Sequence, residues 1–160
     1  MSEQSYTTSI TVDRAPEEVF DAINDVRGWW SQEVEGSTDQ VGAVFRYRGH
    51  DDADTVEHLA TIRVDELVPG RRVVWRVLDN HMSFIDDQTE WRDTEIRFDL
   101  SAADGGTTVR FTHVGLVPAY ECFDVCRDAW TFYVTDSLPR LITTGRGAPI
   151  SSSAGAPSRG

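Results

Sequence analysis

The chain has 160 residues and a formal net charge of −12, because 27 Asp and Glu outnumber 15 basic residues, all of them Arg. This length suits one domain with a complete hydrophobic core. The acidic balance disfavours binding to nucleic acids and to anionic membrane surfaces, since both carry the same sign of charge as the protein.

The sequence shows no signal for export or membrane insertion. No window is as long and apolar as a membrane span, and the N-terminus lacks the basic start and apolar run of a signal peptide. Two Cys residues in one short segment do not make a disulfide framework. We therefore expect a reduced, cytoplasmic, soluble protein.

The N-terminal part predicts a strand followed by a short helix. β-Branched residues alternate over 5–12, as in a strand. Pro16 suits the first turn of a helix that we expect to end near Asn24, and Glu17 and Glu18 suit its positive end. The segment VRGWWSQ follows as a helical turn or loop with two adjacent tryptophans.

The middle of the chain alternates between apolar and polar residues in one segment after another. This pattern is typical of an antiparallel sheet with one face in water. Turn signals separate the segments at 68–70 and 104–106, and 80–90 is expected to be irregular. Strands are expected over 44–48, 55–67, 72–78, 91–100 and 107–114.

Helical spacing replaces the alternation after Pro118. The apolar stripe continues to Ile142, with a kink expected at Pro139 and an end at Gly145. Residues 148–160 are small and polar, and we expect a disordered tail. The order of elements predicts an α+β fold in which a curved antiparallel sheet wraps around the long C-terminal helix.

The face of this sheet that should meet the helix is rich in large rings. Cores usually rely on Leu, Ile and Val, whereas Trp and Tyr combine apolar area with a hydrogen-bonding tip, which suits the walls of a ligand cavity. A solid aromatic core is the alternative. The candidate ligand-binding residues are Trp29, Trp30, Phe45, Tyr47, Trp75, Phe98, Phe111, His113, Trp130 and Tyr133.

His113 has two interpretations. It is a candidate general base or an anchor for a ligand carbonyl. It is more simply a core histidine bonded to its neighbours, because no carboxylate partner can be placed. Cys122 and Cys126 offer too few ligands for a zinc site, and helical geometry disfavours a disulfide between them. We predict no metal site and no cofactor.

Four segments occur in order along the chain: TTSITVDRAPEEVFDAI, GWW, ATIRVDELVPGRRVVWRV and TEIRFDLSAADGGTTVRFTHVGL. Together they resemble a single START-like domain over residues 5–147. This superfamily is also called SRPBCC, helix-grip or birch-pollen-allergen-like, and the branch is that of Hsp-90 ATPase activator homologues. The resemblance implies an apolar cavity between sheet and helix, and it carries over no catalytic residue.

The leading hypothesis is a non-catalytic protein that binds a small hydrophobic ligand in such a cavity. One alternative is a polyketide cyclase- or aromatase-type enzyme that uses the same cavity. Another is a chaperone-interaction module. The sequence leaves a homodimer open.

Overall fold

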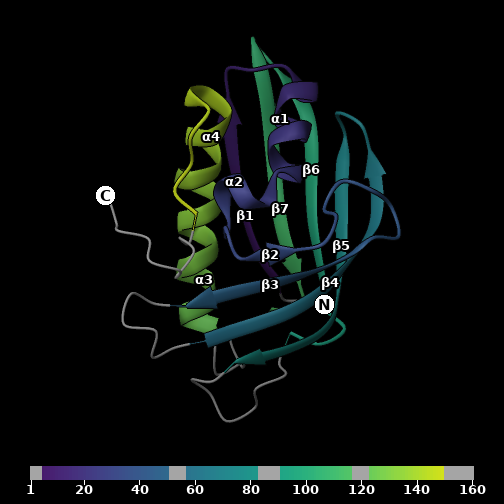
Figure 1. Ribbon diagram of the computed structural model, residues 1–160. Coiled ribbons are helices and arrows are strands. Elements are labelled where there is room, and N and C mark those ends of the chain that lie inside the picture. Colours follow the sequence, from purple (N-terminus) through teal and green to yellow (C-terminus); the bar gives the residue numbers. More distant parts are fainter. Residues whose placement is uncertain (1–4, 51–56, 83–90, 117–122, 150–160) are drawn as a thin grey trace.

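The structure is a computed structural model that describes residues 5–50, 57–82, 91–116 and 123–149. Within these ranges, seven strands form one antiparallel sheet in the order β1-β7-β6-β5-β4-β3-β2. The sheet curves, and the C-terminal helices lie along its open side (Figure 1). This arrangement confirms the predicted α+β, helix-grip fold.

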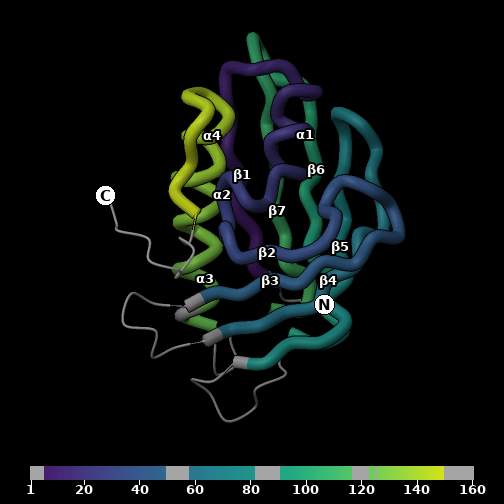
Figure 2. The backbone as a smooth tube through the Cα atoms, viewed as in Figure 1, coloured from purple at the N-terminus to yellow at the C-terminus, as the bar shows by residue number. Residues whose placement is uncertain are grey.

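The elements follow the predicted order, and the chain can be traced through them in Figure 2. The strands are β1 (Ser5–Val12), β2 (Val34–Glu35), β3 (Val44–His50), β4 (Glu57–Val68), β5 (Arg72–Met82), β6 (Glu95–Ala103) and β7 (Gly106–Val114). The helices are α1 (Pro16–Asn24), α2 (Val26–Trp29), α3 (Phe123–Phe132), the π-helical turn η1 (Tyr133–Ser137) and α4 (Leu138–Thr144). None of these helices is long and apolar enough to cross a bilayer.

The alternating pattern identifies the inward face of the long strands. The side chains of these positions pack together under the C-terminal helices and exclude water from the concave side of the sheet. In each of three predicted strands, one set of alternating positions is buried: Val73, Trp75 and Val77; Thr94, Ile96, Phe98 and Leu100; and Val109, Phe111 and His113.

Strand β5 extends to Met82, into the segment that the sequence suggested was irregular. Opposite β4, the pairing skips Leu78 between Val77 and Asp79, which is a β-bulge. The extra residue shifts the alternation, so that Val77 and Asn80 are both buried. The prediction of an irregular segment was therefore wrong at its first residues, and 83–90 lie outside the described ranges.

Pro139 shapes the middle of the C-terminal helix. It lies in the first turn of α4, directly after the π-helical turn η1. Proline has no N–H for the helical ladder, and its ring needs room against the preceding turn. The wider turn supplies that room, so the expected kink takes the form of a π-bulge. Gly145 ends α4 with a φ of 83°, and its amide donates to the Leu141 carbonyl, as predicted.

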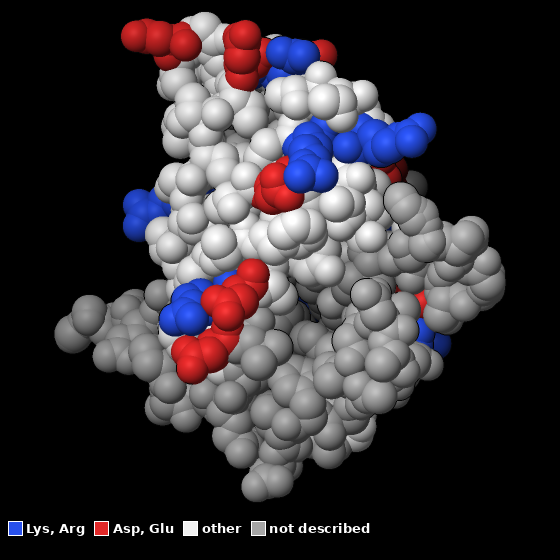
Figure 3. All heavy atoms as spheres, turned by 90° about the vertical axis from the view of Figure 1, so that its left-hand side faces the viewer, with Lys and Arg blue, Asp and Glu red and all other residues white. Residues whose placement is uncertain are grey.

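The outward face of the sheet carries arginines beside carboxylates. Arg72 Nε lies 2.9 Å from Asp99 Oδ1, and Arg97 Nε lies 3.2 Å from Glu95 Oε2. Arg76 also points outward and donates to the Asp93 carbonyl at 2.8 Å. Figure 3 shows the helix side, where the charges form small mixed groups. On α3, Arg127 pairs with Asp124 and Asp128. Exposed pairs contribute roughly 0–1 kcal/mol each, so they balance charge more than they hold the fold.

Ser137 joins three parts of the chain. Its hydroxyl donates to the Trp29 carbonyl at 2.7 Å and accepts from the Ala148 amide at 2.7 Å, in a fully buried position. Ser137→Ala leaves both backbone groups without this partner and should lower the free energy of unfolding by about 1–3 kcal/mol. Urea denaturation measures it. Thr143→Ala removes an exposed hydroxyl from the adjoining helix α4 and should change the free energy of unfolding by less than about 0.5 kcal/mol. Equal effects of the two substitutions would contradict the role of Ser137.

Candidate functional site: an aromatic interior

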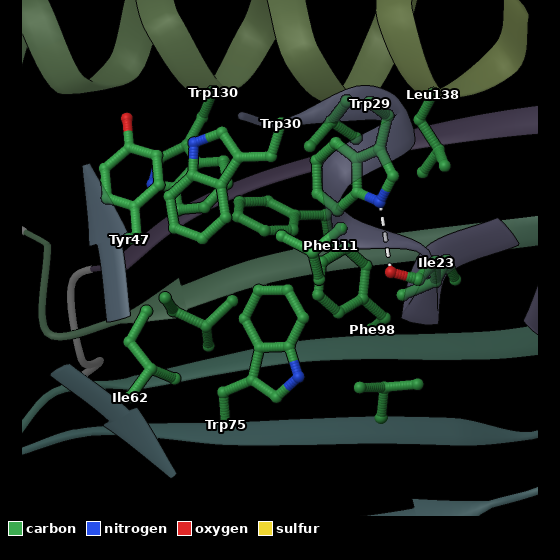
Figure 4. Packing of buried hydrophobic residues seen from close by; sticks show 14 of the residues in the cluster. Ile23, Trp29, Trp30, Tyr47, Ile62, Trp75, Phe98, Phe111, Trp130 and Leu138 are labelled. Atoms are coloured by element: carbon green, nitrogen blue, oxygen red, sulfur yellow. Dashed lines mark hydrogen bonds between the residues drawn. The ribbon is translucent and has the colours of Figure 1, made fainter. Parts of the chain in front are cut away.

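All ten candidate ligand-binding residues lie in the interior. Nine belong to the core or are buried beside it, and Tyr133 packs against them partly buried. They come from α2, from the long strands and from the C-terminal helix, and Figure 4 shows most of them together between sheet and helix. Their role as ligand contacts stays a prediction.

The rings around Trp30 are in direct contact. The Trp30 ring stacks on Tyr47 with 3.9 Å between ring centroids, and the centroid of Trp130 lies 4.8 Å away. Trp75 is parallel to Trp30 within 6° at 5.9 Å. Because these are the spacings of packed aromatic side chains, this part of the interior is filled as its rings now lie.

The rings under α1 and α2 also pack against one another. Trp29 meets Phe98 edge to face at 5.8 Å, and Phe98 meets Phe111 at 5.2 Å. The indole Nε1 of Trp29 donates to the Ile23 carbonyl at 3.0 Å, the dashed line in Figure 4. With its polar tip satisfied, Trp29 acts here as a core residue that fixes α1 against the sheet.

Both ring nitrogens of His113 are hydrogen-bonded. Trp130 Nε1 can only donate, so His113 Nδ1 accepts from it at 3.1 Å. The neutral ring then carries its hydrogen on Nε2 and donates to Thr94 Oγ1 at 2.8 Å, and that hydroxyl donates to the Trp91 carbonyl at 2.6 Å. Burial, and to a smaller extent His58, lower the pKa of His113 to about 3. The geometry thus supports the interpretation as a bonded core histidine.

His58 is the residue that the sequence analysis missed. It lies on the inward face of β4, is 9% exposed, and its Nε2 is shielded with no hydrogen-bond partner. Its ring meets Trp91 edge to face at 4.3 Å and Tyr47 at 5.4 Å. Burial, with His81 adding to it, lowers the pKa of His58 to about 3, so the ring is neutral. Such an unpaired nitrogen costs about 1–3 kcal/mol. His58 lies two residues before Ala60 in β4, so extending the alternation by one more inward position would have predicted that its side chain points inward.

Further polar tips share this interior. The indole nitrogens of Trp75 and Trp91 are buried without a hydrogen-bond partner. Burial raises the pKa of Tyr133 to about 12. Burial, and then the neighbouring Tyr133 and Cys126, raise the pKa of Tyr47 well above its usual value. At neutral pH both phenols keep their protons and serve as hydrogen-bonding groups, not as bases.

A surface hollow of about 250 Å³ adjoins the end of the sheet near His58. Five of the residues that line it, Arg46, Leu59, Thr61, Asp79 and His81, are exposed or half-buried and alternate with the buried Tyr47, Ala60 and Asn80, so the hollow lies on the outward face of β3, β4 and β5. Among the residues described, no group of three or more His, Cys, Asp and Glu side chains is arranged to hold a metal ion. Cys126 is buried with a free thiol, whereas Cys122 lies outside the described ranges.

A curved antiparallel sheet that closes over one C-terminal helix, with an aromatic interior between them, defines a helix-grip protein. The chain belongs to the family described as activator of Hsp90 ATPase homolog 1-like protein, whose family model matches residues 13–143. No curated protein matches the chain.

Solved structures share the fold. The Aha1 dimer from Colwellia psychrerythraea is 23% identical with a TM-score of 0.69, over 89% of this chain and 98% of that one. DynU16, a putative protein of the dynemicin biosynthetic locus, is 18% identical with a TM-score of 0.64; the match covers 91% of this chain and 49% of DynU16. Ara h 8.0201 is 14% identical with a TM-score of 0.61, over 88% and 98%.

Proposed function

We propose that the chain binds a small, largely apolar molecule between the sheet and the C-terminal helix. The observation that carries the proposal is that the ring nitrogens of His58, Trp75 and Trp91 are buried without hydrogen-bond partners, although interiors normally satisfy such groups. Walls of apolar rings with a few polar tips suit a ligand of the same character. Burial of the ligand contributes roughly 25 cal/mol per Å² before the costs of ordering.

The packed rings decide how a ligand enters. Because the Trp30 ring packs against both Tyr47 and Trp130, the centre of the interior opens only if these side chains move. Changes of rotamer on binding are common while the backbone stays in place. The end of the interior near His58 holds two of the unpaired ring nitrogens, those of His58 and Trp91. We place the ligand at that end.

Native mass spectrometry of protein purified from its own host tests the proposal. We expect the mass of one small molecule in addition to that of the chain, lost after extraction with organic solvent. The melting temperature should rise when the ligand is added back, because a ligand that binds only the folded state stabilises it. An unliganded mass, together with an unchanged melting temperature across a panel of apolar compounds, would count against binding.

The enzymatic alternative receives less support from the geometry. Proton transfer needs a group that can change its protonation state near neutral pH. His113 is engaged at both nitrogens, and the pKa values of Tyr47 and Tyr133 are raised by burial. Binding without turnover is the simpler proposal. If the protein turns over a substrate, and if His113→Ala or Tyr133→Phe abolishes that turnover, the enzymatic function becomes the better supported of the two.

The chaperone alternative rests on the family description. It predicts a contiguous apolar patch on the surface. Among the described residues, the exposed large apolar side chains are spread over three parts of the chain: Val41 and Val44, Leu59, and Phe132. A cytoplasmic location remains an expectation from the sequence. The sequence leaves a homodimer open. The similarity to the dimeric Colwellia structure supports a homodimer as a proposal, which light scattering can test.

A further inference from the structure

We infer that His58 and Trp91 form the polar anchor of this ligand site and select an uncharged hydroxyl group carried by a flat ring. The anchor rests on the proposed function, because it needs a ligand that reaches the interior. It goes beyond that function in naming the group that is recognised and the two side chains that recognise it.

The comparison of the two buried histidines points to His58. His113 is fully buried, and its two ring nitrogens are hydrogen-bonded to Trp130 and Thr94. His58 is about as deeply buried, yet its Nε2 has no partner. An apolar side chain at position 58 would fill the same space without an unpaired nitrogen, so packing alone does not require a histidine there. One histidine is thus used by the fold, and the other is available to a ligand.

Trp91 supplies the second half of the anchor. Its ring centroid lies 4.3 Å from that of His58, with the two planes at 87°. Its Nε1 is also buried without a partner. An indole N–H only donates, whereas a neutral imidazole nitrogen either donates or accepts. Two adjacent rings therefore present one fixed donor and one adaptable group.

A hydroxyl satisfies this pair in either tautomer of His58. Its oxygen accepts from Trp91 Nε1, and it either donates its hydrogen to His58 Nε2 or accepts from it. A carbonyl fits only when Nε2 carries the hydrogen. A carboxylate would be buried beside a neutral ring in an acidic protein, without a counter-charge, which is unfavourable.

The surroundings select a flat ring. Tyr47 and Trp91 meet His58 edge to face, and Trp130 stacks parallel to Trp91 within 10°. Aromatic faces and edges of this kind favour aromatic guests in stacked or perpendicular arrangements. Ala60, the next inward residue of β4, has a small side chain. A larger residue at this position would leave less room for a ring beside the anchor.

Three related probes test the anchor: 2-naphthol, naphthalene and 2-naphthoate, titrated against tryptophan fluorescence. We expect wild-type protein to bind 2-naphthol about tenfold more tightly than either of the others, the range of one or two neutral hydrogen bonds. His58→Phe keeps a ring in place and should bind naphthol and naphthalene within about twofold of each other. Thr143→Ala, at an exposed position of α4, is the control and should keep the tenfold preference.

The outcomes separate the anchor from the proposed function. If wild-type protein binds none of the probes, the anchor and the proposed apolar site are both overturned. If naphthol and naphthalene bind wild-type protein equally, or if His58→Phe keeps the preference, apolar binding stands and the anchor alone is overturned. With ¹⁵N-histidine labelling, naphthol should shift one pair of ring resonances, the pair that is absent from His58→Phe. Near-UV circular dichroism checks that each variant is folded.

Discussion

Trp130→Ala is expected to remove much of the stability of the fold. The side chain is 1% exposed, and its ring lies 4.6 Å from Phe111 and 4.8 Å from Trp30. Its Nε1 also satisfies His113 Nδ1. Truncation leaves a cavity and an unpaired nitrogen at once, so we expect a loss of about 3–5 kcal/mol in the free energy of unfolding, measured by urea denaturation. The total free energy of unfolding of a domain is about 5–15 kcal/mol, so this loss is a large part of it.

The same helix supplies a matched control. Phe132 is 42% exposed, so Phe132→Ala should cost less than about 1 kcal/mol although it removes a side chain of similar kind. Trp130→Phe keeps most of the ring and removes the N–H, and we expect an intermediate loss of about 1–3 kcal/mol. A loss in Trp130→Ala no larger than in Phe132→Ala would show that the rings do not pack as described.

Much of this fold could be predicted because its strands alternate strictly. The inward set Val109, Phe111 and His113 needs only period two and a hairpin at 104–106, and the structure has both. The pattern failed where the backbone departs from that period. The bulge at Leu78 moved Asn80 to the inward face, and no local composition marks a bulge in advance.

The candidate site was harder to predict than the fold. Period two places a side chain inward, but it does not say whether the space in front of it is empty or filled by another ring. Trp30 and Tyr47 were predicted as walls of a cavity, and the structure shows them stacked on each other. Hydrogen bonding was also hidden, because the two partners of His113 come from α3 and from the turn before β6.

The two buried histidines also predict how stability depends on pH. The folded-state pKa values of His58 and His113 are lowered to about 3, from 6.5 for an exposed histidine. Between these values the unfolded chain binds more protons than the folded one. Stability is therefore complete above about pH 7 and falls as the pH drops from 6.5 toward 3, by about 1.4 kcal/mol per pH unit for each histidine.

Urea denaturation at about pH 6 and pH 4.5 isolates this effect, because carboxylates titrate mostly below that window. Asp79, for example, has its pKa lowered by the hydrogen bond from Arg92. The free energy of unfolding of wild-type protein should fall by about 4 kcal/mol between these two pH values. That of His58→Phe should fall by about half as much, because His113 is then the one buried histidine of this pair that remains. Thr143→Ala, which changes no titratable group, should follow the wild-type curve. If His58→Phe loses as much as wild type, His58 is protonated in the folded state or reaches water, and an uncharged anchor at that position becomes untenable.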